Sequence, residues 1–247
     1  MFTKKTGRIQ KTADQVLEFS TIIFRLVMAI AKRMDRETIQ YWIGHEKELT
    51  KGLRQLLLKD SKDSVVVDEQ VVEWIKFYQT MFSLELDPAD FSLPATRPGF
   101  GWVILVAKGL TRNAVFELCQ KRFPSWRYFD NLDEVVTIND REPTESYAIR
   151  VRNRVEADEE NKNLSANQAM TAGIKGITNL ERMLLELWYY WKNEQHLDQK
   201  TVTICSGSRC SGGDVPGACW SGGGFWVSDV SPDDSSGRWR VREVVSY

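Results

Sequence analysis

Residues 204–237 restrict the fold of this chain more than any other segment, because their composition argues against a helix. Gly, Ser, Asp and Cys dominate the segment, and Lys, Glu, Gln and Met are absent between Lys200 and Glu243. Small, turn-forming residues of this kind usually build loops on the surface of a folded scaffold. Because apolar, strand-like pieces lie within and beside the segment, we expect strands and loops in a folded domain rather than a flexible linker.

Residues 12–83 show a helical pattern, with apolar side chains at every third or fourth position. Three helices are expected, beginning at Thr12, at Asp35 or Thr38, and at Asp68, with a polar link at 59–64 between the second and third. The first helix is apolar almost all round, which is typical of helices buried on several sides in a bundle or an oligomer. We therefore expect a small helical bundle.

A change of pattern follows at residues 88–101, where three prolines and two glycines predict a linker. Beyond it we expect a buried strand at 102–107, a helix from Thr111 to Pro124 and a half-exposed strand at 147–152. A further helix is expected at 178–192, and short strands at 201–205, 218–220, 225–230 and 239–245. Because the helices precede a run of short strands instead of alternating with them, the fold class is α+β.

Several segments of the C-terminal part carry a resemblance to a known family. They are Arg154–Glu160, Asn163–Asn167, Leu180–Leu187, Cys205–Arg209, Val215-Pro216 and Arg240–Ser246. Residues 100–247 thereby resemble the variable (target) proteins of diversity-generating retroelements, and are similar to uncharacterised bacterial hypothetical proteins. The resemblance implies a C-type-lectin-like, formylglycine-generating-enzyme-like domain at 102–247, with a variable surface at about 204–240. Residues 1–87 would be a helical region for oligomerisation or partner binding, and 88–101 the linker.

In such retroelements, template adenines are copied with errors, and the variable codons are commonly AAC or AAT. Randomising both adenines gives Gly, Ser, Asp, Cys and many other residues, but never Lys, Glu, Gln, Met or Trp. The residue types missing between Lys200 and Glu243 fit this arithmetic. Under this interpretation, Trp220 and Trp226 are encoded outside the randomised codons.

A surface can vary freely only if the core does not depend on it. The invariant core is expected to contain Val202, Ile204, Val215, Trp220, Phe225, Val227, Val241 and Val244. The ligand-binding variable surface is expected to contain Cys210, Gly212, Asp214, Gly217, Cys219, Ser221, Trp226, Ser228, Val230, Asp233, Asp234, Ser236 and Gly237. Trp226 and Trp239 are candidate binding hot spots. The alternative is that both indoles belong to the core.

Catalytic and metal-binding patterns are weak. The histidines, His45 and His196, lie near no nucleophile motif and are expected on the surface. Cys205, Cys210 and Cys219 follow a C-x4-C-x8-C spacing, which lacks the close pair typical of zinc sites. The Glu-Pro-Asn, Gln-Pro-Asp and Trp-Asn-Asp motifs of calcium-dependent lectins are absent. We therefore expect no catalytic residue, no metal and no cofactor.

The first functional hypothesis is a display protein, not an enzyme, whose variable surface recognises a protein or other macromolecule. The alternatives are a formylglycine-generating-enzyme-like enzyme and an intracellular interaction protein that acts through its helical region. The net charge of −1 gives no argument for nucleic acid. Neither a secretory signal nor a span is visible, so a cytoplasmic protein without a membrane span is expected.

Overall fold

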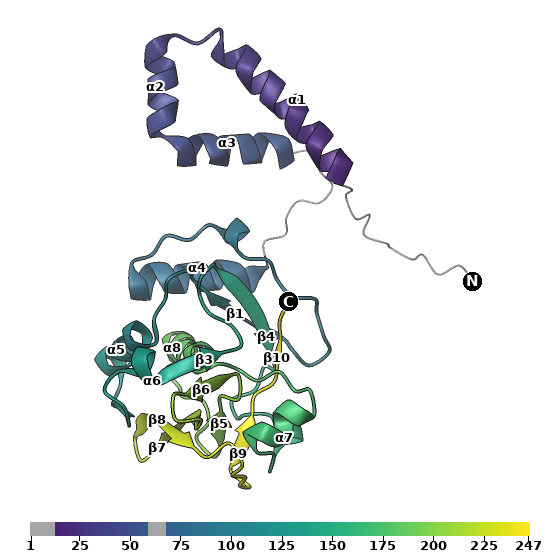
Figure 1. Ribbon diagram of the computed structural model, residues 1–247. Coiled ribbons are helices and arrows are strands. Elements are labelled where there is room, and N and C mark those ends of the chain that lie inside the picture. Colours follow the sequence, from purple (N-terminus) through teal and green to yellow (C-terminus); the bar gives the residue numbers. More distant parts are fainter. Residues whose placement is uncertain (1–12, 59–67) are drawn as a thin grey trace, which may run out of the picture. The chain divides into compact units, whose positions relative to one another are not determined.

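The computed structural model describes residues 13–58 and 68–247, which belong to two compact units, residues 1–66 and 67–247 (Figure 1). The Thr12 cap and the polar link at 59–64 lie outside the described residues. The sequence places the boundary at 88–101, whereas the units divide before the third predicted helix. No helix of the described residues combines the length and the apolar character needed to cross a bilayer.

The N-terminal unit contains α1 (Ala13–Ala31), α2 (Arg36–Gly44) and α3 (Glu46–Leu58), which frame an open triangle in Figure 1. Asp35 caps α2 as expected, since its Oδ1 accepts a hydrogen bond from the N–H of Thr38 at 2.7 Å. The single helix predicted after Asp35 is wrong, because the chain leaves the helical conformation at His45. Gly44 precedes this break, and glycine weakens a helix by about 1 kcal/mol relative to alanine.

The predicted third helix is α4 (Glu69–Phe82), and Asp68 caps it by accepting from the N–H of Gln70 at 3.0 Å. The indole Nε1–H of Trp74 donates to the carbonyl of Val103 at 2.7 Å. One turn further, the Tyr78 hydroxyl donates to the carbonyl of Leu105 at 2.8 Å. Both acceptors lie in β1 (Trp102–Val106), so α4 is fastened to the C-terminal unit.

Residues 88–101 also pack on the C-terminal unit and do not link the two units. They contain the short helix η1 (Pro88–Asp90), and the side chains of Phe91 and Phe100 are buried. The Pro94 carbonyl accepts a hydrogen bond from the Arg150 guanidinium at 3.0 Å. Residues 88–101 therefore do not form the predicted linker between two domains. Their prolines favour an extended backbone, which runs along the surface of the C-terminal unit.

A three-stranded antiparallel sheet has the order β1-β4-β10, with β4 at Tyr147–Val151 and β10 at Val244–Val245. The strand predicted as half-exposed is β4, and this detail is wrong because β4 is central and four of its five side chains are buried. Arg150 is one of them, and it keeps its hydrogen bond to Pro94 and an ion pair with Asp68 at 3.7 Å.

The second sheet has five strands in the order β2-β8-β7-β5-β9. They are β2 (Ser125–Arg127), β8 (Gly224–Val230), β7 (Val215–Ser221), β5 (Val202–Ile204) and β9 (Trp239–Val241). The single strand predicted at 239–245 is thus two strands, β9 and β10, which belong to different sheets. A third pair, β3 (Val136–Asn139) with β6 (Ser208–Cys210), has no counterpart in the sequence prediction.

The helices of the C-terminal unit begin at side-chain caps. Thr111 caps α5 (Arg112–Arg122), and Thr178 with Glu181 forms a capping box at the start of α8 (Asn179–Asn193). The shorter helices are α6 (Leu132–Val135), η2 (Glu159–Asn161) and α7 (Ala166–Thr171). Helix α8 packs between α4, α5 and both larger sheets, and eleven of its fifteen side chains are buried. The predicted α+β class is confirmed by this arrangement.

Candidate ligand-binding surface

The hairpin of β7 and β8 carries six of the thirteen predicted surface residues. Cross-strand pairs such as Cys219 with Trp226 and Gly217 with Ser228 share one face of the sheet. The opposite face carries Ala218, Phe225 and Val227, which are buried in the core. The alternation of side chains along each strand therefore separates a core face from an outer face.

A stacked pair of indoles stands on this outer face. Trp126 of β2 lies directly opposite Trp226 of β8, with ring centroids 4.8 Å apart and ring planes 21° from parallel. Each of the two indoles is 43% exposed. The Nε1–H of Trp226 donates to the carbonyl of Ser221 at 2.8 Å, which fixes the orientation of this ring. We call Trp126 and Trp226 the indole pair.

Tyr128, directly after β2, is a further exposed aromatic residue. Its N–H donates to the carbonyl of Val227 at 3.0 Å, so the backbone of β2 continues along β8 past Arg127. Tyr128 itself lies at a bend directly after the end of β2. Its ring is 76% exposed. Two exposed aromatic residues, Trp126 and Tyr128, thus lie in and directly after the edge strand β2.

The stacking of Trp126 depends on the glycine at position 224. A Cβ added there would lie 1.6 Å from Cζ3 of Trp126, so any other residue forces this ring away. We predict that Gly224→Ala lowers the free energy of unfolding by about 1–3 kcal/mol. It should also remove the circular-dichroism couplet expected of two stacked indoles. Gly212→Ala is the matched control, because its added Cβ meets no atom within 4 Å; an unchanged couplet in Gly224→Ala would refute the assignment.

The structure places the thirteen predicted surface residues at different depths. Those exposed are Gly212, Ser221, Trp226, Ser228, Asp233, Asp234 and Gly237. Those half-buried are Asp214, Cys219, Val230 and Ser236, and those buried are Cys210 and Gly217. Trp239, the second candidate hot spot, is half-buried against a small cluster under α7. Of the eight expected core residues, only Val202 and Trp220 are not fully buried.

The predicted exposure of Cys210 and Gly217 is wrong. Cys210 is only 4% exposed, because it lies in β6, which pairs with β3. The backbone N–H of Cys210 donates to the carbonyl of Asp214 at 2.7 Å. Gly217 lies on the outer face, but there the sheet is covered, and an added Cβ would contact Cγ1 of Val202 at 3.5 Å. The cover over Gly217 comes from β5, whose Val202 and Ile204 side chains lie next to it, and Ile204 belongs to a small buried cluster with Ala166 and Ala169 of α7.

The remaining surface extends along the hairpin. At one end, the pair Val215 and Val230 brings the 211–214 turn close to the 231–237 loop. This loop is tied to α7, because the side-chain amide of Asn167 donates to Asp233 at 2.7 Å. The indole pair lies toward the other end, beside the turn at 222–223.

Sequence reasoning missed Trp126 and Tyr128 as surface residues. The alternation of aromatic and polar side chains from Trp126 to Tyr128 is typical of a short extended piece at 126–129, and it does not by itself indicate which side chains reach the surface. Nothing in the local pattern indicated that β2 pairs with β8, a hundred residues further along the chain. A parallel contact of this kind is set by the tertiary fold.

A fully buried charge cluster lies between α8 and the strands. The Arg182 guanidinium bonds Glu186 and Asp198, each at 2.9 Å, and Arg242 bonds the other oxygen of Asp198 at 3.0 Å. His196 is half-buried, since its Nδ1 lies 2.9 Å from Glu186 and its ring stacks on Trp220. The surface position expected for His196 is therefore wrong. His45 is exposed, as expected, with its Nδ1 at 2.8 Å from the carbonyl of Tyr41.

Burial sets the protonation of the cysteines, all four of which are free thiols. It raises the pKa of Cys205 to about 12 and that of Cys210 to about 11. Burial also raises the pKa of Cys119 and Cys219. Thiolates, and not thiols, act as nucleophiles and metal ligands. Within residues 13–58 and 68–247, no three His, Cys, Asp or Glu side chains gather closely enough to hold a metal ion.

We therefore predict that the folded protein reacts slowly with a thiol reagent at neutral pH. Titration with 5,5′-dithiobis(2-nitrobenzoate) at about pH 8 should leave Cys119, Cys205 and Cys210 unmodified over minutes, because a buried thiol is both protonated and inaccessible. All four should react once the chain is unfolded in guanidinium chloride. Rapid modification of Cys205 in the folded state, identified by mass spectrometry, would contradict the assignment.

Comparisons of this chain with protein-family models, with curated proteins and with solved structures find no match.

Proposed function

We propose that this chain is a ligand-binding display protein. Its C-terminal unit, in a C-type-lectin-like fold, would recognise a protein or other macromolecule through the outer face of the β7–β8 hairpin, without catalysis. The observation that supports this most strongly is the indole pair: two stacked, half-exposed Trp side chains on a face whose reverse side forms the core. Tryptophan is enriched among the residues that carry most of the energy of protein interfaces.

The preorganisation of the indole pair favours a binding role over chance exposure. Trp226 is held by its hydrogen bond to Ser221, and Trp126 occupies space that only a glycine at 224 leaves open. Rigid aromatic side chains lose little conformational entropy on binding, so their buried area contributes efficiently to affinity. The pair therefore has the properties of a fixed anchor at one end of the surface.

The surroundings of the anchor are suited to variation. Ser221, Ser228 and Gly212 are exposed, and the loop residues Asp233 and Asp234 are exposed as well. Substitutions at exposed positions usually change the free energy of unfolding by less than about 0.5 kcal/mol. The supporting face, with Phe225 and Val227, makes no use of these side chains. A constant anchor beside interchangeable positions is the arrangement expected of a surface that acquires new specificities.

The proposal can be tested by asking whether this surface accepts new specificities. A phage-displayed library of the full chain would be randomised at Gly212, Ser221, Ser228, Asp233 and Asp234, with lysozyme as the probe protein. A control library would randomise five exposed positions away from the hairpin, for example Lys108, Glu117, Lys121, Glu145 and Lys200. We expect folded, specific lysozyme binders from the first library and none from the second. Binders from neither library, or equally from both, would overturn the proposal.

A further inference from the structure

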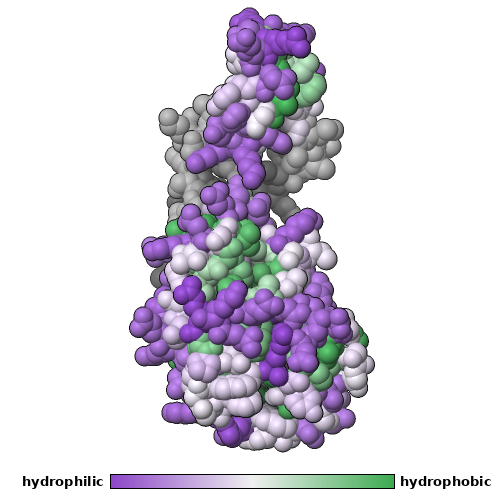
Figure 2. Space-filling view, turned by 90° about the vertical axis from the view of Figure 1, so that its left-hand side faces the viewer, coloured by the Kyte–Doolittle hydropathy of each residue, from purple (hydrophilic) through white to green (hydrophobic). Residues whose placement is uncertain are grey.

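The helical unit exposes apolar side chains on every described helix. Between residues 20 and 53 no side chain is buried, although α1 alone presents Ile22, Phe24, Leu26 and Ile30 to solvent. Figure 2 shows hydrophobic side chains at the surface of this unit beside hydrophilic ones. Soluble monomers rarely leave large contiguous apolar areas exposed, and such areas usually mark interaction sites.

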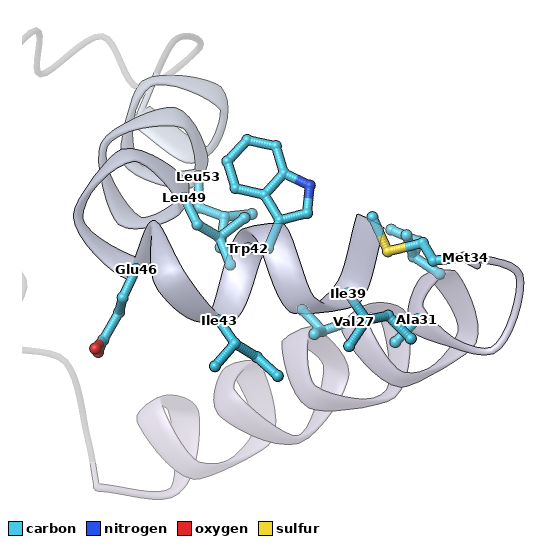
Figure 3. A pocket seen from close by; sticks show the side chains of 10 residues that line it. Val27, Ala31, Met34, Ile39, Trp42, Ile43, Glu46, Leu49 and Leu53 are labelled. Atoms are coloured by element: carbon cyan, nitrogen blue, oxygen red, sulfur yellow. The ribbon is translucent and has the colours of Figure 1, made fainter. Parts of the chain in front are cut away.

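The apolar side chains of the three helices line a groove of about 470 Å³. Figure 3 shows Val27 and Ala31 of α1 directed toward Ile39 and Ile43 of α2 across this groove. The α3 side chains Leu49 and Leu53 continue its wall. Glu46, at the beginning of α3, is the only charged residue of the lining. The groove is thus an apolar channel with one negative charge.

A second apolar stripe lies on a different face of α1. Ile22, Leu26 and Ala29 are spaced four and three residues apart, so they line up along one side of the helix. On a helix with 3.6 residues per turn this side lies about 120° away from the groove-lining residues. Every charged side chain between residues 20 and 34 is cationic, and two of them, Arg25 and Arg33, flank the stripe.

We propose that the chain self-associates through these two features, with the Ile22–Leu26–Ala29 stripe of one copy seated in the α1–α2–α3 groove of another. Among the described residues, this unit presents an apolar groove lined by all three helices and a separate exposed apolar stripe on α1. Their charges are complementary, since the stripe is flanked by arginines and the groove carries Glu46. This inference concerns the helical unit and does not depend on the proposed function of the hairpin.

Sedimentation velocity of the full chain, from about 1 to about 100 μM, tests the inference. We expect a species of at least twice the monomer mass of 28.5 kDa. Leu26→Glu in the stripe and Ile43→Glu in the groove should each raise the dissociation constant at least tenfold. Their side chains are 54% and 66% exposed in the single chain, so neither change should unfold it. Ile138→Glu, at an exposed apolar residue of the C-terminal unit, is the control and should leave association unchanged.

Charge reversal separates self-association from binding to a different protein. Glu46→Lys should weaken association, and combining it with Arg25→Glu and Arg33→Glu in the same chain should restore it. Restoration within one sequence requires that both charge sets belong to copies of this chain. A wild-type chain that sediments as a monomer over the whole range would overturn the inference. So would an oligomer that is unaffected by both Leu26→Glu and Ile43→Glu.

Discussion

Replacing Asp198 by asparagine is expected to lower the free energy of unfolding of the C-terminal unit by about 3–5 kcal/mol, the usual effect of breaking a buried ion pair. Asp198 accepts from Arg182 and Arg242, and all three side chains are fully buried. Asparagine has nearly the same size, so it leaves no cavity. It does leave two guanidinium groups in the interior with one carboxylate, Glu186, to neutralise them.

Urea denaturation monitored by Trp fluorescence would measure this effect. The matched control is Glu160→Gln, which removes a carboxylate whose ion pair with Arg154 is 2.6 Å long but exposed. Exposed pairs contribute about 0–1 kcal/mol, so this variant should be close to wild type. Equal losses in Asp198→Asn and Glu160→Gln would show that burial of the charge cluster is not what stabilises this unit.

The free energies of unfolding of the wild type and of Asp198→Asn should also depend differently on pH. Burial by itself raises the pKa of Asp198, but the two neighbouring guanidinium groups and a hydroxyl hydrogen bond outweigh it and hold the pKa below its ordinary value of 3.8. A carboxylate with a lowered folded-state pKa stabilises the protein above its unfolded-state pKa, and this contribution is lost as the pH falls through the folded-state pKa. As the pH is lowered from neutral to acid, the free energy of unfolding of Asp198→Asn should therefore decrease less than that of the wild type.

The second large effect is expected on binding. In a lysozyme binder selected from the first library, Trp226→Ala should raise the dissociation constant about 30-fold or more, corresponding to at least about 2 kcal/mol for an aromatic hot spot. Because the Trp226 side chain is half-exposed, the unfolding midpoint should move much less than it does for Asp198→Asn. Surface plasmon resonance and urea denaturation of the same preparations would separate the two quantities.

The control for this variant is Ile138→Ala, which truncates an exposed apolar side chain outside the hairpin. Its dissociation constant should match that of the selected binder. If Trp226→Ala binds as well as this control while Trp126→Ala also binds normally, the indole pair is not an anchor and the recognition surface lies elsewhere.

The local features of the fold were predictable because they are encoded within a few residues. Thr111, Thr178, Asp35 and Asp68 all cap helices where the sequence indicates, and the apolar run at 102–107 contains the buried strand β1. Alternation likewise separates Phe225 and Val227, which are buried, from Trp226 and Ser228, which are exposed. Each of these features depends on periodicity or on a single hydrogen bond.

The remaining features depend on contacts between distant segments, which leave no local signal. Trp126 stacks on Trp226 because β2 pairs with β8, and Gly217 is buried because Val202 and Ile204 of β5 lie next to it. The charges of α8 are another example: Arg182 and Glu186 suggest an exposed face, yet both are buried because Asp198 and Arg242 arrive from later segments. The helical pattern of α4 predicts that it belongs to the N-terminal bundle, whereas its hydrogen bonds to β1 fasten it to the C-terminal unit.

Sequencing the DNA around the gene would show whether residues 204–237 are varied by a retroelement. We expect a nearby reverse transcriptase gene and a near-repeat of the codons for residues 204–246 that differs mainly at adenines. The differing codons should be those of outward-facing residues such as Ser221, Ser228 and Asp233, and the codons of Val215, Phe225 and Val227 should be unchanged. A locus with neither the repeat nor the reverse transcriptase, or a repeat whose differences fall on the buried residues, would contradict the claim that this surface is varied for recognition.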